Sequence, residues 1–241
     1  MSKTFSLEGK NAVVTGLSTG IGQSIAEALA REGANVAGHF QKDRAGAAVT
    51  QGLIQAQGRE ALIVQGSPAD ETHVDDLADQ VVERWGSLDI WVNNAARILV
   101  KPFLELETDD WHRLLAANLH GYMFGCRAAA RKMATQEGPG RIINITSQAD
   151  VQSISGMSVY ITAKSGINGL TRTLALELAD YDITVNSVSP GPTDTPLNKR
   201  AWTPKARATY IERIGLHRVA TPEEPADVVC FVASHASRFM T

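Results

Sequence analysis

The sequence predicts an α/β fold in which a doubly wound parallel sheet carries helices on both faces, giving three layers. Short apolar runs typical of buried parallel strands alternate with helical segments along the chain. A glycine-rich segment at 15–22 follows the first run and opens the first helix. The chain has 241 residues, 44% of them hydrophobic, which is enough for one sizeable core. Since no linker, repeat or low-complexity segment interrupts it, residues 1–241 are predicted to form one domain.

The strands are predicted from apolar runs with few polar residues, the pattern of strands covered on both faces. Six such segments occur, at 11–15, 35–40, 62–64, 88–92, 141–146 and 183–188. Their repeated alternation with helices is what indicates a parallel sheet rather than hairpins.

The first helices are predicted where the apolar pattern lengthens and capping residues occur. One runs from the glycine-rich turn towards Arg31, and another from about 71 to 85. Thr108 is expected to cap a long helix that begins near Asp109.

The last third of the chain contains two further predicted helices. One carries Tyr160 and Lys164 and extends to about Asp180. The proline-rich segment 189–196 then breaks regular structure. Residues 221–224, Thr-Pro-Glu-Glu, begin the final helix with a cap, a first-turn proline and a capping-box glutamate.

Composition excludes several classes of function. The net charge is -3 with acids and bases interspersed, so no basic stripe favours nucleic acid and no polybasic run favours a membrane. No run is long and apolar enough to span a bilayer, and the polar segment Met1–Lys10 is unlike a signal peptide. A cytoplasmic protein is therefore expected. Cys126 and Cys230 lie in apolar helical contexts, which favours buried thiols over a disulfide or a metal site.

The glycine-rich turn predicts a dinucleotide site. Gly16 permits the tight turn, Gly20 lets the backbone approach a pyrophosphate, and Gly22 lets helix and strand pack closely. The helix N-terminus offers unpaired N–H groups and a partial positive charge. An ordinary βα turn is the alternative, and the strand before and helix after favour the nucleotide site.

Polar residues end two of the predicted strands and interrupt one predicted helix. Asn93 and Asn94 close the fourth strand, where their amides would brace the edge at which α/β sheets bind ligands, or would only form a polar loop. Ser147 follows the fifth strand, where its hydroxyl could hold a substrate oxygen or serve as a turn residue. Asn118 interrupts an apolar helical pattern, where it fixes a water or is a satisfied buried amide.

Tyr160 and Lys164 stand four residues apart and so share one helical face. A free phenol has a pKa of about 10, which is too high for proton exchange at neutral pH. A nearby ammonium favours the phenolate and lowers that pKa. The pair therefore predicts an acid–base group, although a surface Tyr–Lys pair would look the same.

Taken together, these motifs resemble the short-chain dehydrogenase/reductase family, in its compact single-domain form. The segment 15–22 fits the family's TGxxxGxG motif, 93–95 fits the start of its NNAG, and 190–191 fits its PG. The family's catalytic set is matched by Asn118, Ser147, Tyr160 and Lys164. The resemblance covers almost the whole chain and implies a Rossmann sheet.

The resemblance also implies roles. Tyr160 would give or take the proton, Ser147 would orient the substrate oxygen, and Asn118 would hold a relay water. Lys164 would lower the tyrosine pKa and bind the nicotinamide ribose, and Thr195 would lie near the carboxamide. The implied cofactor contacts are Gly16, Ser18, Thr19, Gly20, Ile21, Phe40, Lys42, Asn94, Ala95, Tyr160, Lys164, Pro190, Gly191, Thr193 and Thr195.

The chain departs from the family pattern in three places. Ala96 replaces the last glycine of NNAG, and Ser67 stands where an aspartate usually contacts adenine, with Asp70 as an uncertain substitute. The usual last strand is missing after Phe239-Met240-Thr241, which would leave a sheet edge unpaired.

The end of the second strand bears on the choice of cofactor. An acid there would bind a ribose 2′-hydroxyl and repel a 2′-phosphate. Phe40 holds the position, with Lys42 and Arg44 nearby and Asp43 as the one acid. The sequence therefore favours NADP(H), with Lys42 or Arg44 on the phosphate, while NAD(H) remains the alternative.

The expected activity is hydride transfer between a nicotinamide cofactor and a carbonyl or secondary alcohol. Sugar or polyol dehydrogenase and 3-oxoacyl reductase both fit, and the substrate loop at about 195–216 holds the informative residues. Trp202 and Tyr210 would stack on a sugar, shape an apolar slot or merely cap the site. The basic residues of this loop would suit the phosphopantetheine of a carrier protein or form a solvated, mobile lid. A silent nucleotide sensor is the competing class. The family implies a small-molecule substrate and a homodimer or homotetramer.

Overall fold

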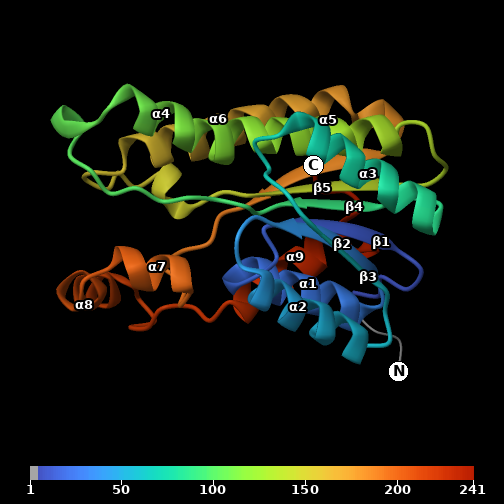
Figure 1. The fold of residues 1–241 in the computed structure, drawn as a ribbon, viewed down its shortest axis with the longest axis horizontal. Coiled ribbons are helices and arrows are strands. Elements are labelled where there is room, and N and C mark those ends of the chain that lie inside the picture. The colour runs from blue at the N-terminus through green and yellow to red at the C-terminus, as the bar shows by residue number, and fades with distance from the viewer. Residues whose placement is uncertain (1–4) are drawn as a thin grey trace.

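The computed structural model describes residues 5–241, so the first four residues of the segment Met1–Lys10 lie outside the described part. The chain forms three layers, with a sheet between two groups of helices (Figure 1). The strands are β1 Asn11–Thr15, β2 Asn35–Phe40, β3 Ala61–Gln65, β4 Ile90–Asn93, β5 Gly140–Ile145 and β6 Ile183–Val188. The α-helices are α1 Gly20–Glu32, α2 Arg44–Ala56, α3 Glu71–Trp85, α4 Thr108–Leu115, α5 Gly121–Met133, α6 Ser158–Glu177, α7 Pro196–Ala201, α8 Pro204–Arg213 and α9 Glu223–Ala233.

The sheet has the order β3-β2-β1-β4-β5-β6, and every pair is parallel. The fold is therefore the doubly wound parallel arrangement that the sequence predicts. The strand order reverses between β1 and β4, and ligands of such sheets bind at the carboxyl ends of the strands beside this reversal. Ser147, the glycine turn and Asn94 all follow strands that end there.

Each face of the sheet has its own core. On one face α1 and α9 pack closely, with residues such as Ile25, Leu29 and Val229 fully buried. On the other face α3, α5 and α6 cover the strands, with Leu77 and Trp91 at the centre. Figure 1 shows these two helical layers above and below the sheet. Burial on both faces explains why the strands read as continuous apolar runs.

Four elements differ from the sequence prediction. Helix α2 was not predicted, although Ala47, Thr50 and Ile54 recur at helical spacing and are buried; Asp43 caps it by accepting from Gly46 N at 2.9 Å. The final helix α9 begins at Glu223 with Pro222 as its N-cap and without a side-chain cap, rather than with the cap predicted at Thr221. The long helix predicted from Asp109 is two helices joined by a π-helical turn at Ala116–His120, and its N-cap is Glu107 rather than Thr108. The substrate loop contains the two short helices α7 and α8.

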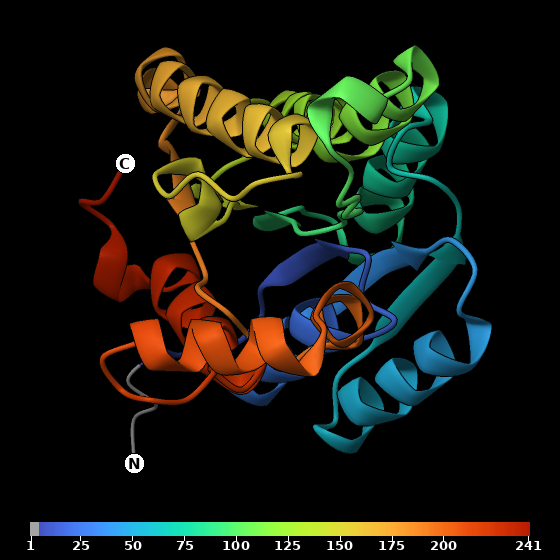
Figure 2. The same ribbon diagram turned by 90° about the vertical axis from the view of Figure 1, so that its left-hand side faces the viewer.

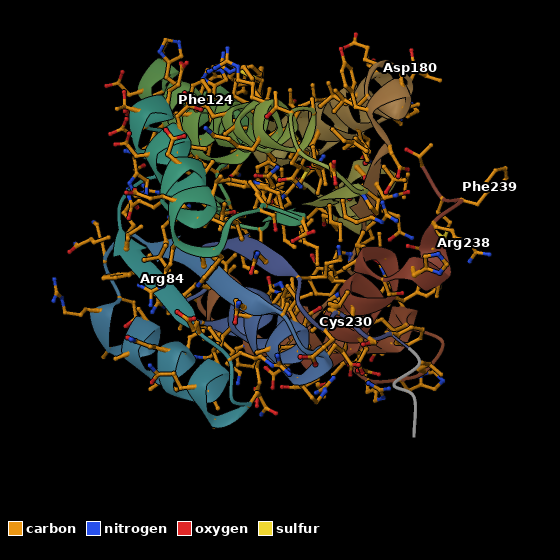
Figure 3. All side chains as sticks on the ribbon, turned by 90° about the vertical axis from the view of Figure 1, so that its right-hand side faces the viewer. Arg84, Phe124, Asp180, Cys230, Arg238 and Phe239 are labelled. Carbon is orange, nitrogen blue, oxygen red and sulfur yellow. The ribbon has the colours of Figure 1, made fainter. Side chains whose placement is uncertain are left out.

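The end of the described chain lies beside β6, which forms one edge of the sheet. Thr241 Oγ1 accepts from Val185 N at 3.0 Å, and Met240 O accepts from the Asn186 amide at 2.9 Å. In the described residues the edge of β6 is thus contacted by a terminal segment rather than by a strand. Figure 3 shows Phe239 projecting away from the body of the molecule.

Both cysteines are buried and free, as predicted. Cys126 lies in α5 and Cys230 in α9. Figure 3 shows Cys230 and Phe124, a residue of α5, on opposite sides of the sheet. Burial raises the pKa of each thiol to about 12, so neither is a reactive thiolate near neutral pH. Among residues 5–241, no helix is long and apolar enough to cross a bilayer.

Candidate active site

One large cleft, of about 730 Å³, opens at the carboxyl edge of the sheet. Its lining comes from the glycine turn, the ends of β2, β4 and β5, the start of α6, and residues of α7 and α8. Figure 2 shows α7 and α8 in front of the sheet in this view. Its size suits a dinucleotide together with a small substrate. Every cofactor contact implied by the family resemblance lines this cleft, as do Ser147, Tyr160 and Lys164.

The glycine turn has the geometry of a phosphate-binding loop. Gly16 and Gly20 have φ of 68° and 60°, which is the left-handed region that favours glycine. Helix α1 begins at Gly20, and Thr19, its N-cap, provides no side-chain cap. The first N–H groups of α1 therefore remain available at the cleft for an anion.

The paired asparagines brace the edge of the sheet, as predicted. The Asn94 amide donates to Thr15 O at 2.9 Å, while Thr15 Oγ1 accepts from the backbone N–H groups of Asn94 and Ala95 at 2.8 and 3.0 Å. The Asn93 amide donates to Asn144 Oδ1 at 2.9 Å in the sheet. These bonds join β1, β4 and β5 where the cleft floor needs a fixed shape.

Replacing Gly22 with alanine is expected to destabilise this floor. An added Cβ would lie 2.4 Å from both the Asn94 amide nitrogen and Gly16 O, so the turn would have to shift. We expect a loss of about 1–3 kcal/mol in unfolding free energy and weaker nucleotide binding, measured by urea unfolding and fluorescence titration. Gly52 in α2 has no atom within 4 Å of such a Cβ, so Gly52→Ala is the control and is expected to be neutral or stabilising. Equal effects of the two substitutions would contradict this expectation.

Tyr160 lies in the first turn of α6 with its side chain nearly buried against Ala149 and Met157. Ser147 lies at the same cleft, where its Oγ accepts from Ala149 N at 3.2 Å. Burial raises the pKa of Tyr160, the Ser147 side chain opposes that rise, and the nearby charge of Asp150 adds to it. Both hydroxyl-bearing residues therefore line the same wall of the cleft.

Lys164 is almost fully buried beneath the same cleft. Its Nζ donates to Ile145 O at 2.6 Å and to the Tyr122 hydroxyl at 2.9 Å, and lies 5.7 Å from the centre of the Tyr160 ring. Burial lowers the pKa of Lys164 to about 7, with Asp150 acting against it. The expectation that lysine lowers the pKa of Tyr160 does not describe this structure, because desolvation dominates the phenol and both acceptors of the ammonium belong to other residues.

Asn118 lies in the π-helical turn that separates α4 from α5. Its side chain is fully buried and does not line the cleft. Its Oδ1 accepts from Arg97 N at 2.8 Å, and its Nδ2 donates to Arg97 O at 2.7 Å. Both ends of the amide are therefore used to fix the segment after β4, and a π-helical turn is a frequent mark of a functional site.

Several residues at the site escaped the sequence analysis. Tyr122 is buried and donates to Ile145 O at 2.9 Å, so it positions the carbonyl and the ammonium of Lys164 together. Asp150 influences the pKa of both Tyr160 and Lys164. Tyr122 stands four residues after Asn118, and on a helix this spacing places both side chains on one face. That spacing is the one signal in the sequence that could have identified Tyr122 as part of the site.

The adenosine end of the cleft lies at the end of β2. Phe40 and Lys42 line the cleft there, whereas Arg44 does not and instead donates to Gln65 Oε1 at 3.3 Å. Ser67 lines the same end and accepts from the Gln41 amide at 3.4 Å. Of the two cations proposed from sequence for a 2′-phosphate, only Lys42 therefore borders the cleft.

The substrate end of the cleft is largely apolar. Trp202 and Tyr210, from the segment of α7 and α8, bring their ring centroids to 5.3 Å and both line the cleft. The remaining apolar lining near Tyr160 comes from Ile98, Val100, Ile154, Met157 and Leu197. A carbonyl carbon carried on an apolar body would fit beside Ser147 and Tyr160.

Comparisons with known proteins cover nearly the whole chain. A family model described as enoyl-(acyl carrier protein) reductase matches residues 16–241. The 3beta-hydroxysteroid dehydrogenase 1 of Eggerthella lenta is 36% identical over 236 residues, covering 98% of this chain and 90% of that protein. The 3-oxoacyl-(acyl-carrier-protein) reductase of Staphylococcus epidermidis is 35% identical over 234 residues, covering 96% of this chain and 94% of that protein. A crystal structure of a short chain dehydrogenase from Burkholderia cenocepacia in complex with NADP is 36% identical with a TM-score of 0.91, covering 98% of this chain and 94% of that one.

Proposed function

The chain belongs to the short-chain dehydrogenase/reductase family and is an NAD(P)-dependent oxidoreductase of carbonyl and alcohol groups, and from that premise we propose that Tyr160 is its proton-transfer residue. The observation that carries this proposal is that Tyr160, in the first turn of α6, and Ser147, which follows β5, line the same cleft as the glycine turn. The cofactor fits the residues present, because the glycine turn opens α1 at the cleft and the cleft is large enough for a dinucleotide. When bound, the nicotinamide supplies the hydride chemistry.

The protein's own groups hold the substrate oxygen and move its proton. Ser147 and Tyr160 present two hydroxyls to that oxygen, which fixes the reacting carbon at the cleft wall. In reduction Tyr160 donates its proton to the developing alkoxide, and in oxidation it takes the proton of the alcohol. Lys164 lies beneath Tyr160 and donates to Ile145 O and to the Tyr122 hydroxyl, and its proposed role is to fix this wall and to bind the nicotinamide ribose.

The proton must then pass between Tyr160 and solvent. Asn118 cannot use its side chain for this, because both ends of the amide bind the Arg97 backbone. We propose that Asn118 contributes its main-chain carbonyl at the π-helical turn, where helical hydrogen bonding is disturbed, and that this carbonyl holds the relay water.

The substrate is proposed to be an apolar carbonyl compound or its alcohol. The apolar lining by Ile154, Met157 and Trp202 supports this class over a sugar, which would need more polar partners at the same wall. A panel of 3-oxoacyl thioesters, cyclic ketones and sugars, followed by nicotinamide absorbance, tests it. Turnover of sugars alone would contradict the apolar class.

NADP(H) is proposed as the preferred cofactor, because no acid occupies the end of β2. Steady-state kinetics with both cofactors tests this preference, and a clear preference for NADH would contradict it. Tight nucleotide binding without turnover across the whole panel would instead support a sensor.

The cellular setting and assembly are proposed from the family alone. We propose a cytoplasmic homodimer or homotetramer that uses the outer surfaces of α4, α5 and α6. Light scattering at working concentration tests assembly, and a monomer would contradict it.

A further inference from the structure

The adenosine end of the cleft contains a cation that no role above uses. We infer that Arg97 binds the ribose 2′-phosphate of NADP(H) and that it, rather than Lys42 or Arg44, sets the preference for that cofactor. This inference rests on the proposed function, because it names the residue that determines the proposed preference for NADP(H).

The tip of the Arg97 side chain reaches the place where the ribose is recognised. Its Nη2 donates to Gln41 Oε1 at 2.6 Å, and Arg97 lines the cleft. Gln41 directly follows Phe40, the last residue of β2. In doubly wound sheets the adenosine ribose is bound at the end of the second strand, so this guanidinium lies beside the expected position of the 2′-substituent.

Both ends of Arg97 are held before any ligand arrives. The Asn118 amide bonds its backbone N–H and carbonyl at 2.8 and 2.7 Å, and Gln41 holds the tip. An arginine fixed in this way loses little side-chain entropy on binding a phosphate. Its planar donors also suit bidentate contact with phosphate oxygens better than a lysine ammonium does.

The charge of Arg97 is not neutralised by a carboxylate. The guanidinium donates to an amide oxygen, and within residues 5–241 no ion pair involves Arg97. The Gln41 amide also donates to the Ser67 hydroxyl. The family usually carries an aspartate at the position of Ser67. The neutral hydroxyl therefore stands where a carboxylate would attract the Arg97 guanidinium. Asp43, the acid nearest the end of β2, is engaged in capping α2.

The two other cations are less well placed. Arg44 does not line the cleft and donates to Gln65. Lys42 lines the cleft but is exposed, and it has no hydrogen bond or ion pair that would fix it among the described residues. An exposed lysine is a point charge with a costly rotamer entropy, so its contribution is expected to be smaller.

Arg97→Gln keeps a polar side chain of similar length and removes the charge, which makes it the decisive variant. We expect the ratio of kcat/KM with NADPH to kcat/KM with NADH to fall by about 10- to 100-fold, as for loss of a charged hydrogen bond. The ratio of the NADPH and NADH dissociation constants, measured by fluorescence titration without substrate, is expected to change by a similar factor. Arg97→Lys should retain an intermediate preference, because the charge stays and the planar fork is lost.

Arg44→Gln is the matched control and is expected to change either ratio by less than about 2-fold, since its side chain points to Gln65. Unchanged ratios in Arg97→Gln, or a larger fall in Lys42→Gln than in Arg97→Gln, would overturn the assignment. Thermal unfolding of each variant checks the fold, and Arg97→Lys decides the question if Arg97→Gln is unstable. If nucleotides bind but no substrate is turned over, the proposed oxidoreductase function fails. In that case the ratio of the NADPH and NADH dissociation constants alone decides the role of Arg97.

Discussion

Replacing Tyr160 with phenylalanine is expected to lower kcat by about 10²- to 10⁴-fold, the range of a lost general acid–base group. The substitution removes only the hydroxyl at the cleft wall, so the nearly buried ring and its packing against Ala149 and Met157 remain. We therefore expect nucleotide binding to persist and the free energy of unfolding to change by no more than about 1 kcal/mol. Nicotinamide absorbance with a verified substrate measures the rate, and urea unfolding measures the stability.

Tyr181→Phe is the matched control for this experiment. Tyr181 follows α6, is 53% exposed and does not line the cleft, so its hydroxyl is expected to have no effect on kcat. Near-full turnover by Tyr160→Phe would exclude Tyr160 as the proton-transfer residue. A loss of nucleotide binding equal to the loss of rate would point instead to a structural role for the hydroxyl.

Replacing Lys164 with methionine is expected to remove most activity and to change how stability depends on pH. The substitution removes the bonds to Ile145 O and the Tyr122 hydroxyl and the proposed contact with the nicotinamide ribose, so kcat/KM is expected to fall by about 10²-fold or more. Methionine is similar in volume and leaves Tyr122 able to donate to Ile145 O. The protein is therefore expected to stay folded while losing the reaction.

The pH dependence follows from the pKa of about 7 that burial gives Lys164, compared with an ordinary value of 10.5. The unfolded chain binds the lysine proton throughout the interval between these values, while the folded chain has largely released it. The free energy of unfolding of the parent protein therefore rises as the pH increases from about 7 towards 10.5. Below pH 7 this contribution to stability is absent, because both states bind the proton. Relative to Lys164→Met, the parent protein is expected to gain up to about 2–3 kcal/mol between pH 7 and pH 9.

Urea unfolding of both proteins at the two pH values measures this difference. Lys132→Met is the control, because Lys132 forms a surface ion pair with Asp79 on α3 and its substitution is expected to have no such pH dependence. A parent protein that gains no stability over Lys164→Met across the window would mean that the buried amine keeps its ordinary pKa.

The strands and the order of the motifs were predictable because they depend on local sequence. A strand covered on both faces needs a continuous apolar run, and all six such runs form strands with bounds shifted by only a few residues. Helix α2 was missed although Ala47, Thr50 and Ile54 recur at helical spacing, whereas the π-helical turn was missed because nothing local distinguishes it from a regular helix.

The side chains lining the cleft were also largely predictable, because parallel strands bring their carboxyl ends to one edge. Gly16, Asn94, Ser147 and Tyr160 all border the same cleft although they are far apart in sequence. The pKa of Tyr160 was not predictable, because it depends on burial and on Asp150 rather than on spacing from Lys164. The role of Arg44 was misjudged for a similar reason, since its side chain turns away to Gln65.

The sequence by itself determined the fold, the nucleotide-binding turn and the residues able to carry the reaction, because these depend on apolar periodicity, on glycine and on chemical type. Only the tertiary structure decided which groups share hydrogen bonds. It assigned Lys164 to Tyr122 and Ile145, used the Asn118 amide to fix the Arg97 backbone, and joined the Arg97 side chain to Gln41. The physical reason is that a hydrogen bond or a pKa depends on distances of a few ångströms and on burial, which chain folding sets and local sequence does not encode.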